Sequence, residues 1–304
     1  MFDPEPVRAV ANAGYDTRVR VFRCGNIIDS FAVITARYLI LIDTMVSRDS
    51  MEKVMKTLAT HLQGQPRTPL VINTHGDWDH VWGNGLFVGP DALYPAPIIG
   101  QRLTVGAMAT PEAYELLSTF QAESPGPYDT AGWWPPTVRC DGDMTIDGGD
   151  LSLRVVSTPG HTPDHTSIWI PELRLLLAGD AAEMPFPQVG GADALPALRA
   201  SLQRLERLRA DIVLYSHAPG VIDPTLIRHN IRYFDELDHR CRTAVTPLSL
   251  SDIEAADDPA RLIDWPLEEA LPPGMSVSDL SLPEFYRAGH NSAIRAMLSW
   301  LRGS

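Results

Sequence analysis

The sequence predicts a mixed α/β protein, of the α/β or α+β class, and three observations lead to this prediction. Short segments rich in β-branched and aromatic residues alternate with segments whose apolar residues recur every three or four positions. The composition, with 44% hydrophobic and 21% charged residues, is that of an ordinary globular protein. The length of 304 residues is enough to bury a large core without disulfides or structural metals.

The first strands and the first helix occupy the amino-terminal third. Residues 18–44 contain three predicted strands, VRVFRC, FAVITA and YLILID. Residues 47–64 predict a helix that ends near Gly64 and Pro66, and PLVINTH is the next predicted strand. The residues on the apolar stripe of this helix are Met51, Val54, Met55, Leu58 and Leu62.

The rest of the chain returns to strands and then becomes helical. Residues 101–137 begin with helical spacing and continue as a long irregular stretch, which is typical of a lid or a binding loop. Strand patterns resume in MTIDG, LSLRVVSTPG, TSIWIP and LRLLLAGD. Residues 193–209 predict an amphipathic helix, DIVLYSH predicts a last strand, and the chain after Pro224 is predicted to be helical.

Charge and composition exclude several classes of partner. The chain has 25 Lys and Arg against 38 Asp and Glu, a net charge of −13, without a basic cluster. We therefore expect no nucleic-acid partner. No apolar run approaches the roughly 20 residues of a membrane helix, so we expect no membrane partner. The three cysteines are far apart and no secretory h-region is present, which favours a cytoplasmic location without disulfides.

The strongest local feature is THGDWDH, residues 74–80, which directly follows the strand LVIN. It places His75, Asp77, Asp79 and His80 within six positions. Imidazole nitrogen and carboxylate oxygen are ligands that Zn²⁺, Mn²⁺ and Fe²⁺ accept, so the motif indicates a metal site. The competing interpretation is a structural turn in which Asp79 caps a helix.

Three more ligand-type residues follow predicted strands. His161 lies in TPGHT, Asp180 in LAGD and His217 in YSH. Loops at the carboxyl ends of strands commonly assemble sites in sheet proteins. Each residue alone would more often be structural, but together with THGDWDH they favour one metal centre.

With these motifs the chain resembles the metallo-β-lactamase-fold hydrolase superfamily, which carries H-x-H-x-D-H, Gly-His, Gly-Asp and a final His in this order. The resemblance covers about residues 18–222. It implies a four-layer αββα sandwich with metals at one edge between two sheets. We therefore expect a single domain over 1–304, with this core, a lid insertion at about 101–137 and a helical carboxyl-terminal extension at about 225–304.

The resemblance also implies two divalent ions, zinc first of all. Asp79 would be the catalytic residue, orienting the attacking water or accepting its proton. The implied ligands are His75, residue 77 and His161 for one ion, Asp79, His80 and His217 for the other, and Asp180 as the bridge.

The chain departs from the family pattern at position 77, where Asp replaces the usual His and gives H-x-D-x-D-H. A carboxylate there moves the preference toward harder ions such as Mn²⁺ or Fe²⁺. With His75 and His161 it would form a two-His, one-carboxylate set of the kind found in non-haem iron oxygenases. Alternatively, Asp77 turns away and leaves one site weak.

The function that this resemblance implies is hydrolysis of an ester, lactone or thioester of a small molecule by a metal-activated hydroxide. Two alternatives stay open at this point. One is a mononuclear non-haem iron dioxygenase acting on a sulfur compound. The other is a non-catalytic metal- or ligand-binding protein of the same fold.

Aromatic residues near the motif and in the predicted lid are candidates for substrate binding, because ligand sites are often lined by aromatic side chains. The candidates are Trp78, Trp133 and Trp134. The alternative is that these aromatic residues form a hydrophobic plug or the contact of a homodimer. His165, four residues after His161, is expected at the surface, and a supporting position beside the metal ligands is the alternative.

Overall fold

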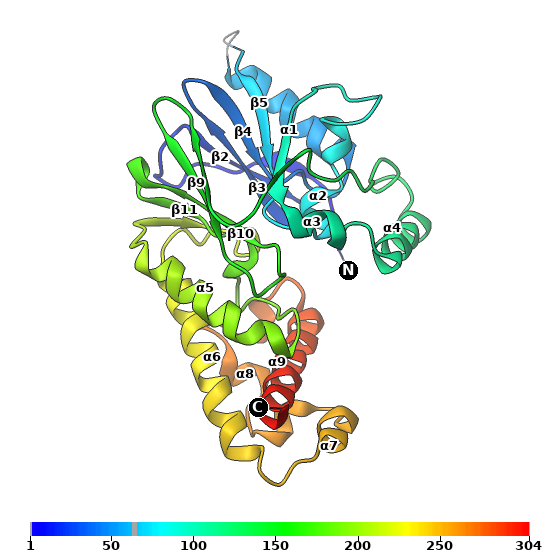
Figure 1. Cartoon of the computed structure of the whole chain (residues 1–304), viewed down its shortest axis with the longest axis vertical. Helices are drawn as coiled ribbons and strands as arrows, with labels where there is room; N and C mark the ends of the chain where they lie inside the picture. Colours follow the sequence, from blue (N-terminus) through cyan, green and yellow to red (C-terminus); the bar gives the residue numbers. More distant parts are fainter. Residues whose placement is uncertain (1, 63–65, 304) are drawn as a thin grey trace. The chain divides into compact units, whose positions relative to one another are not determined.

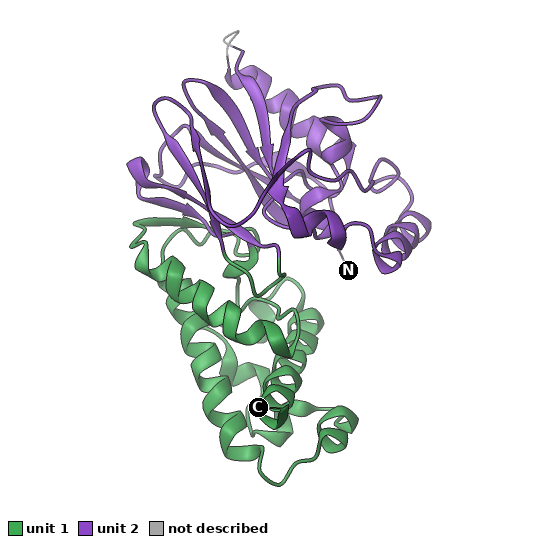
Figure 2. Cartoon of the chain, in the orientation of Figure 1, with its two compact units in different colours: residues 1, 158–163, 180–304 green, residues 2–157, 164–179 purple. Residues whose placement is uncertain are grey.

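The computed structural model describes residues 2–62 and 66–303, which form two compact units (Figure 2). We call residues 2–157 and 164–179 the sheet unit. Residues 158–163 and 180–303 are the helical unit. The expected single domain stays a prediction.

The first sheet of the sheet unit runs from β1 to β7 in chain order. Strands β1 to β4 pair antiparallel, and β4 to β7 pair parallel. The predicted strands are confirmed, whereas β1, β6 and β7 were not predicted because runs of three or four residues are too short to show a period. The strands are β1 (Val7–Ala9), β2 (Val19–Cys24), β3 (Ile28–Ile34), β4 (Tyr38–Ile42), β5 (Thr68–Ile72), β6 (Ile98–Gln101) and β7 (Val138–Cys140).

The parallel pairing of β4 with β5 sets up one edge of this sheet. Ile42 is in register with Ile72, so both strands end side by side. The residues that follow, Asp43 after β4 and Asn73 and Thr74 after β5, therefore lie at the same edge. Backbone hydrogen bonds continue there, from Asp43 N to Ile72 O at 2.9 Å.

The second sheet runs β11-β10-β9-β8 within the sheet unit, and all these pairs are antiparallel. Thr166, the first residue of β10, donates from its backbone nitrogen and its hydroxyl to the carbonyl of Thr74, at 2.8 and 3.0 Å. This contact ties the second sheet to the edge of the first. The strands are β8 (Met144–Asp147), β9 (Ser152–Ser157), β10 (Thr166–Ile170) and β11 (Leu175–Leu177).

Four α-helices accompany these sheets in the described part of the sheet unit: α1 (Arg48–His61), α2 (Trp78–Val81), α3 (Arg102–Ala107) and α4 (Pro111–Glu123). Helix α1, labelled in Figure 1, begins at a capping box of Ser47 and Ser50. Its apolar stripe joins one hydrophobic cluster with residues of the first sheet. It ends at His61, and the predicted stop at Gly64 lies outside the described residues. Helices α3 and α4 carry the first half of the predicted lid.

The helical unit contains one described strand, β12 (Ile212–Leu214), and the predicted helical carboxyl-terminal extension is confirmed. Phe186 stacks on Tyr233 of α6 at 4.1 Å between ring centroids. Among residues 2–62 and 66–303, no helix combines the length and apolarity that crossing a membrane requires. The helices are α5 (Leu195–Arg207), α6 (Thr225–Ala244), α7 (Leu250–Ala255), α8 (Leu267–Ala270) and α9 (Pro283–Gly303).

Candidate metal centre

The THGDWDH segment leaves the carboxyl end of β5 and enters α2. Asp77 occupies the N-cap position of α2 in extended backbone, with φ −74° and ψ 151°, and its side chain makes no capping hydrogen bond. Asp79 and His80 lie inside the helix. The interpretation of Asp79 as a helix cap is therefore wrong, and α2 instead fixes the backbone of two ligand-type residues.

A buried network fixes the tautomers of His75 and His80. Nδ1 of His80 lies 2.8 Å from Oδ2 of Asp43, which can only accept while ionised. Thr74 donates its hydroxyl proton to the same oxygen at 2.8 Å, so its own oxygen accepts from Nδ1 of His75 at 3.0 Å. Both imidazoles thus carry their proton on Nδ1 and present the lone pair of Nε2, which is the form a metal ligand needs.

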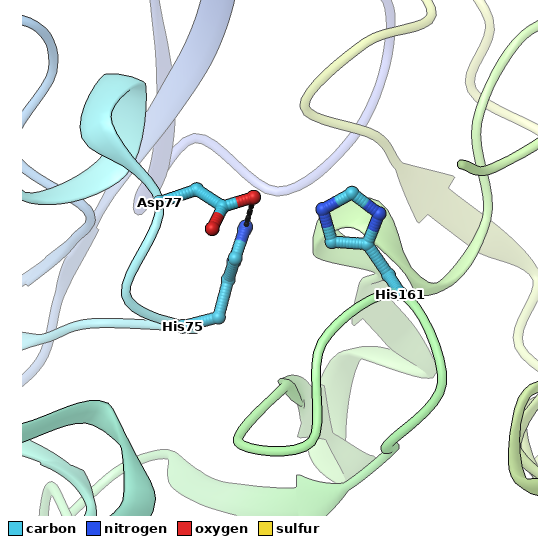
Figure 3. A group of neighbouring side chains, drawn as sticks. All are labelled: His75, Asp77 and His161. Carbon is cyan, nitrogen blue, oxygen red and sulfur yellow. Dashed lines mark ion pairs between the residues drawn. The ribbon is translucent and has the colours of Figure 1, made fainter. Parts of the chain in front are cut away.

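Each of these Nε2 atoms lies beside a carboxylate of the same segment. Nε2 of His75 is 3.4 Å from Oδ2 of Asp77 (Figure 3). Nε2 of His80 is 3.7 Å from Oδ2 of Asp79. The two imidazole rings are 4.1 Å apart between centroids, and neither side chain is exposed. The structure therefore brings together all four predicted ligands of the sheet unit.

The other three predicted ligands lie within the helical unit and are close to one another. Oδ2 of Asp180 lies 3.6 Å from Nε2 of His161 and 3.2 Å from Nε2 of His217. Nδ1 of His161 faces the carbonyl of Gln188 at 3.2 Å, so it carries the proton and leaves the lone pair on Nε2. Asp180 is thus positioned between two histidines, as a bridging ligand would be.

These distances and donor atoms fit divalent metal ions. Two ligands bonded to one tetrahedral ion at about 2.1 Å are roughly 3.4 Å apart. The four observed Nε2-to-carboxylate distances lie between 3.2 and 3.7 Å. Nitrogen and carboxylate oxygen are ligands for Zn²⁺, Mn²⁺ and Fe²⁺, so the residues present fit these ions.

The residues that surround these candidate ligands were not predicted from the sequence. Asp43, Thr74 and Asp164 are buried, and Thr104 of α3 donates to Oδ2 of Asp164 at 2.7 Å. The prediction of a surface position for His165 is wrong, since its side chain is buried with its ring 5.0 Å from that of His75. The feature that could have pointed to Asp43 is its position directly after β4, the strand that pairs in parallel with β5.

Glu183 is a further buried acid of the helical unit that the sequence analysis did not identify. Tyr286 of α9 donates its hydroxyl to Oε1 of Glu183 at 2.7 Å, and Asn230 of α6 bonds the backbone of Glu183. Burial raises the pKa of Glu183 to about 7, while the charge of His217 lowers it and that of Asp180 raises it. Two helices of the carboxyl-terminal extension therefore hold this acid three residues after Asp180.

The three predicted substrate-binding tryptophans have different surroundings. Trp78 and Trp133 both pack against Trp82, with ring centroids 5.1 and 5.6 Å apart. Trp134 is 39% exposed and, with Arg48 and ten other residues, lines a cavity of about 320 Å³. Their contact with substrate stays a prediction.

Comparisons with known proteins agree with this architecture. The family model of the metallo-beta-lactamase superfamily matches residues 25–217. A curated relative, the beta-lactamase-like protein 2 homolog of Caenorhabditis elegans, is 37% identical over 81 residues, which are 27% of this chain and 26% of the relative. The chain therefore aligns with only about a quarter of that protein's length.

Two solved structures show the same fold. A beta-lactamase domain protein from Burkholderia ambifaria has a TM-score of 0.67 at 18% identity, covering 97% of this chain and 88% of that one. A metallo-beta-lactamase from Pontibacter korlensis has a TM-score of 0.55 at 21% identity, covering 76% and 99%. The predicted fold is thereby confirmed. Because the family model matches more than half of its residues, the chain belongs to the metallo-β-lactamase superfamily.

Proposed function

We propose that the chain is a metal-dependent hydrolase that cleaves an ester, lactone or thioester of a small molecule with two divalent ions. The observation that carries this proposal is the set of four histidine Nε2 atoms, each 3.2–3.7 Å from a carboxylate oxygen. Membership of the superfamily supports a hydrolase of this kind.

In this proposal the seven ligands predicted from the sequence would hold the two ions. When bound, divalent ions supply a water of lowered pKa and polarise the carbonyl that is attacked. Asp180 would be a ligand shared by both ions. Two groups of three side chains would each hold one ion: His75, Asp77 and His161, and Asp79, His80 and His217.

The chain's own residues would position the reactants. Asp79 is fixed by α2, and its largely buried carboxylate would orient the attacking water and accept its proton. Asp43 and Thr74 hold His80 and His75 in the tautomer that ligates, which keeps the ligand geometry preorganised. Zinc is the proposed metal, and Asp77 makes Mn²⁺ or Fe²⁺ the competitors.

The test is metal-dependent hydrolysis by the purified protein. Elemental analysis should find two divalent ions per chain, and a panel of esters, lactones and thioesters should include a substrate. Chelation should abolish turnover, and re-added metal should restore it. Asp79→Asn should lower kcat by a factor on the order of 10²–10⁴, while the exposed control Asp257→Asn should not. Hydrolysis that survives complete metal removal would contradict the proposal.

One observation favours a second candidate. The carboxylate of Asp77 beside Nε2 of His75 is part of a two-His, one-carboxylate donor set with His161, which suits a single Fe²⁺ and oxygen chemistry (Figure 3). A dioxygenase acting on a sulfur compound would take up oxygen after anaerobic iron loading and would hydrolyse none of the panel. One tightly bound iron per chain together with oxygen uptake would replace the hydrolase by this function.

A further inference from the structure

Phe120 of α4 is enclosed by aromatic rings. Its ring centroid lies 4.7 Å from that of Trp78, 4.9 Å from that of Tyr128 and 5.4 Å from that of Trp82. Phe2 adds a fourth ring at 6.3 Å. We call Phe2, Trp78, Trp82 and Tyr128 the aromatic cage.

Helix α4 has few apolar contacts with the rest of the sheet unit, and hydrogen bonds from Gln121 to the carbonyl of Tyr128 and from Trp133 to the carbonyl of Ala113 complete its attachment. None of the residues of α4 is buried, and Phe120 and Leu117 are the side chains by which it packs against the core cluster. Phe120 itself is half-buried. A side chain anchored in this way can leave the cage at a lower cost than a core residue could, because few other buried contacts of α4 depend on it.

The cage contains two buried hydrogen-bond donors that lack acceptors. Within the part of the chain that the structure describes, Nε1 of Trp82 and the hydroxyl of Tyr128 have no hydrogen-bond partner. Both side chains are at most 1% exposed. Burying such groups unpaired is costly, and the phenylalanine ring that fills the cage offers no oxygen or nitrogen acceptor. A ligand that brought its own acceptor would pair at least one of them.

The cage adjoins the residues of the proposed chemistry. Trp78 is the first residue of α2 and Trp82 is its C-cap, and Asp79 and His80 lie between them in the helix. Burial raises the pKa of Tyr128, and the charges of Cys24, Asp3 and Asp79 raise it further. The Tyr128 phenol therefore keeps its proton at neutral pH and remains a hydrogen-bond donor.

We propose that the aromatic cage is a subsite for a flat apolar group bonded to a hydrogen-bond acceptor, and that Phe120 occupies it when no ligand is bound. The ligand class is an aromatic ring bonded to a carbonyl, as in an ester or thioester of benzoic acid. This inference rests on the proposed function for its role in catalysis, because it names the part of the substrate that would be bound beside Asp79. The binding itself needs neither metal nor turnover.

The experiment measures binding of acetophenone, which has a ring and a carbonyl but no hydrolysable bond, to the metal-free full chain by calorimetry. Phe120→Ala should bind acetophenone about tenfold more tightly than the wild type, because the competing ring is gone. Leu117→Ala is the matched control, since it also weakens the packing of α4 but removes no ring from the cage. An unchanged affinity in Phe120→Ala, or an equal gain in Leu117→Ala, would overturn the assignment.

A second variant tests the donor. The wild type and Phe120→Ala should prefer acetophenone to isopropylbenzene, which has the ring without the carbonyl. Tyr128→Phe in the Phe120→Ala background should reduce this preference by about fivefold and leave the affinity for isopropylbenzene unchanged. A preference that survives the loss of the hydroxyl would overturn the role of Tyr128. If thermal melting shows that Phe120→Ala is unfolded, Phe120→Leu replaces it, with a smaller expected gain.

The two proposals fail in different ways. Acetophenone binding with the expected variant effects but without metal-dependent hydrolysis would support the subsite and contradict the hydrolase. Metal-dependent hydrolysis of the panel without any gain in acetophenone affinity in Phe120→Ala would support the hydrolase and contradict the subsite. If both hold, Phe120→Ala should lower KM for methyl benzoate more than for methyl acetate.

Discussion

The carboxylate of Asp43 lies 2.8 Å from Nδ1 of His80, and neither side chain is exposed. Asp43 also accepts from the backbone nitrogen and the hydroxyl of Thr74, both at 2.8 Å. Its backbone has φ 63°, a left-handed conformation that few residues other than glycine, Asn and Asp adopt readily. A non-glycine residue held there with three donors around it is best explained by the need to orient His80.

Asp43→Asn should weaken metal binding without disturbing the backbone, because Asn also tolerates the left-handed region. An amide has one oxygen, so it cannot serve Thr74 and His80 as the carboxylate does, and its NH₂ group opposes the required tautomer of His80. We expect metal affinity to fall about 10- to 100-fold, measured by competition with a chelator. Asp29→Asn is the control, a buried acid that pairs with Arg23 instead of a histidine. An affinity equal to that of the wild type would contradict the assigned role.

Asp77→His should move the metal preference toward zinc. The native side chain makes no capping bond at the start of α2, so its replacement should cost the helix little. Imidazole is a softer ligand than carboxylate, and the change restores the usual pattern of the superfamily. After loading from an equimolar mixture of Zn²⁺, Mn²⁺ and Fe²⁺ under anaerobic conditions, elemental analysis should show a higher zinc fraction than in the wild type. The same fraction in both proteins would show that Asp77 does not set the preference.

The candidate ligands could be found in the sequence because they lie in the segments that follow predicted strands. His75, Asp180 and His217 come after runs such as LVIN, LRLLL and DIVLY, whose apolar residues mark the strands. The fold class followed from the same runs. The two-unit division and the short strands β1, β6 and β7 could not be predicted, since three or four residues carry no measurable period.

The supporting residues were harder to find because their roles arise from pairing between distant segments. Asp43 meets His80 only because β4 and β5 are adjacent and parallel. His165 is buried because Thr166 bonds the carbonyl of Thr74, ninety-two positions away. In the sequence alone, a polar residue at such a site has the same appearance as one on the surface.

Gly160→Ala should destabilise the protein and weaken metal binding together. Gly160 has φ 142°, and a Cβ atom there would lie 2.3 Å from Cα of Leu198 in α5. Because the obstacle is backbone, either α5 or the turn that carries His161 must move. We expect a loss of at least about 2 kcal/mol in the free energy of unfolding, measured in urea. Gly106→Ala is the control: it lies in α3 with open space around it and should be neutral or stabilising by up to about 1 kcal/mol. A Gly160→Ala protein as stable as the wild type would show that a Cβ atom at position 160 does not clash with the backbone of α5.

Acid should destabilise the chain through two histidines of the helical unit. Nε2 of His290 donates to the carbonyl of Trp265 at 2.8 Å, so Nδ1 accepts from the hydroxyl of Tyr233 at 2.9 Å and the imidazole is neutral. Burial lowers the pKa of His290. Burial, aided by the charge of Arg232, lowers the pKa of His229 from 6.5 to about 4.

The lowered pKa values of His229 and His290 change the stability of the folded chain in the same direction. Below pH 6.5 the unfolded chain binds protons that the folded chain does not, so the stability is present above 6.5 and is lost as the pH falls toward 4. His229 accounts for a loss of about 2 to 3 kcal/mol in the free energy of unfolding at pH 4. His229→Gln should therefore flatten the fall in free energy of unfolding between pH 6.5 and 4, measured by urea titrations in the presence of a chelator. His61→Gln, at an exposed histidine of α1, should leave the slope as in the wild type. A slope that is equally steep in His229→Gln would show that His229 is not buried in its neutral form.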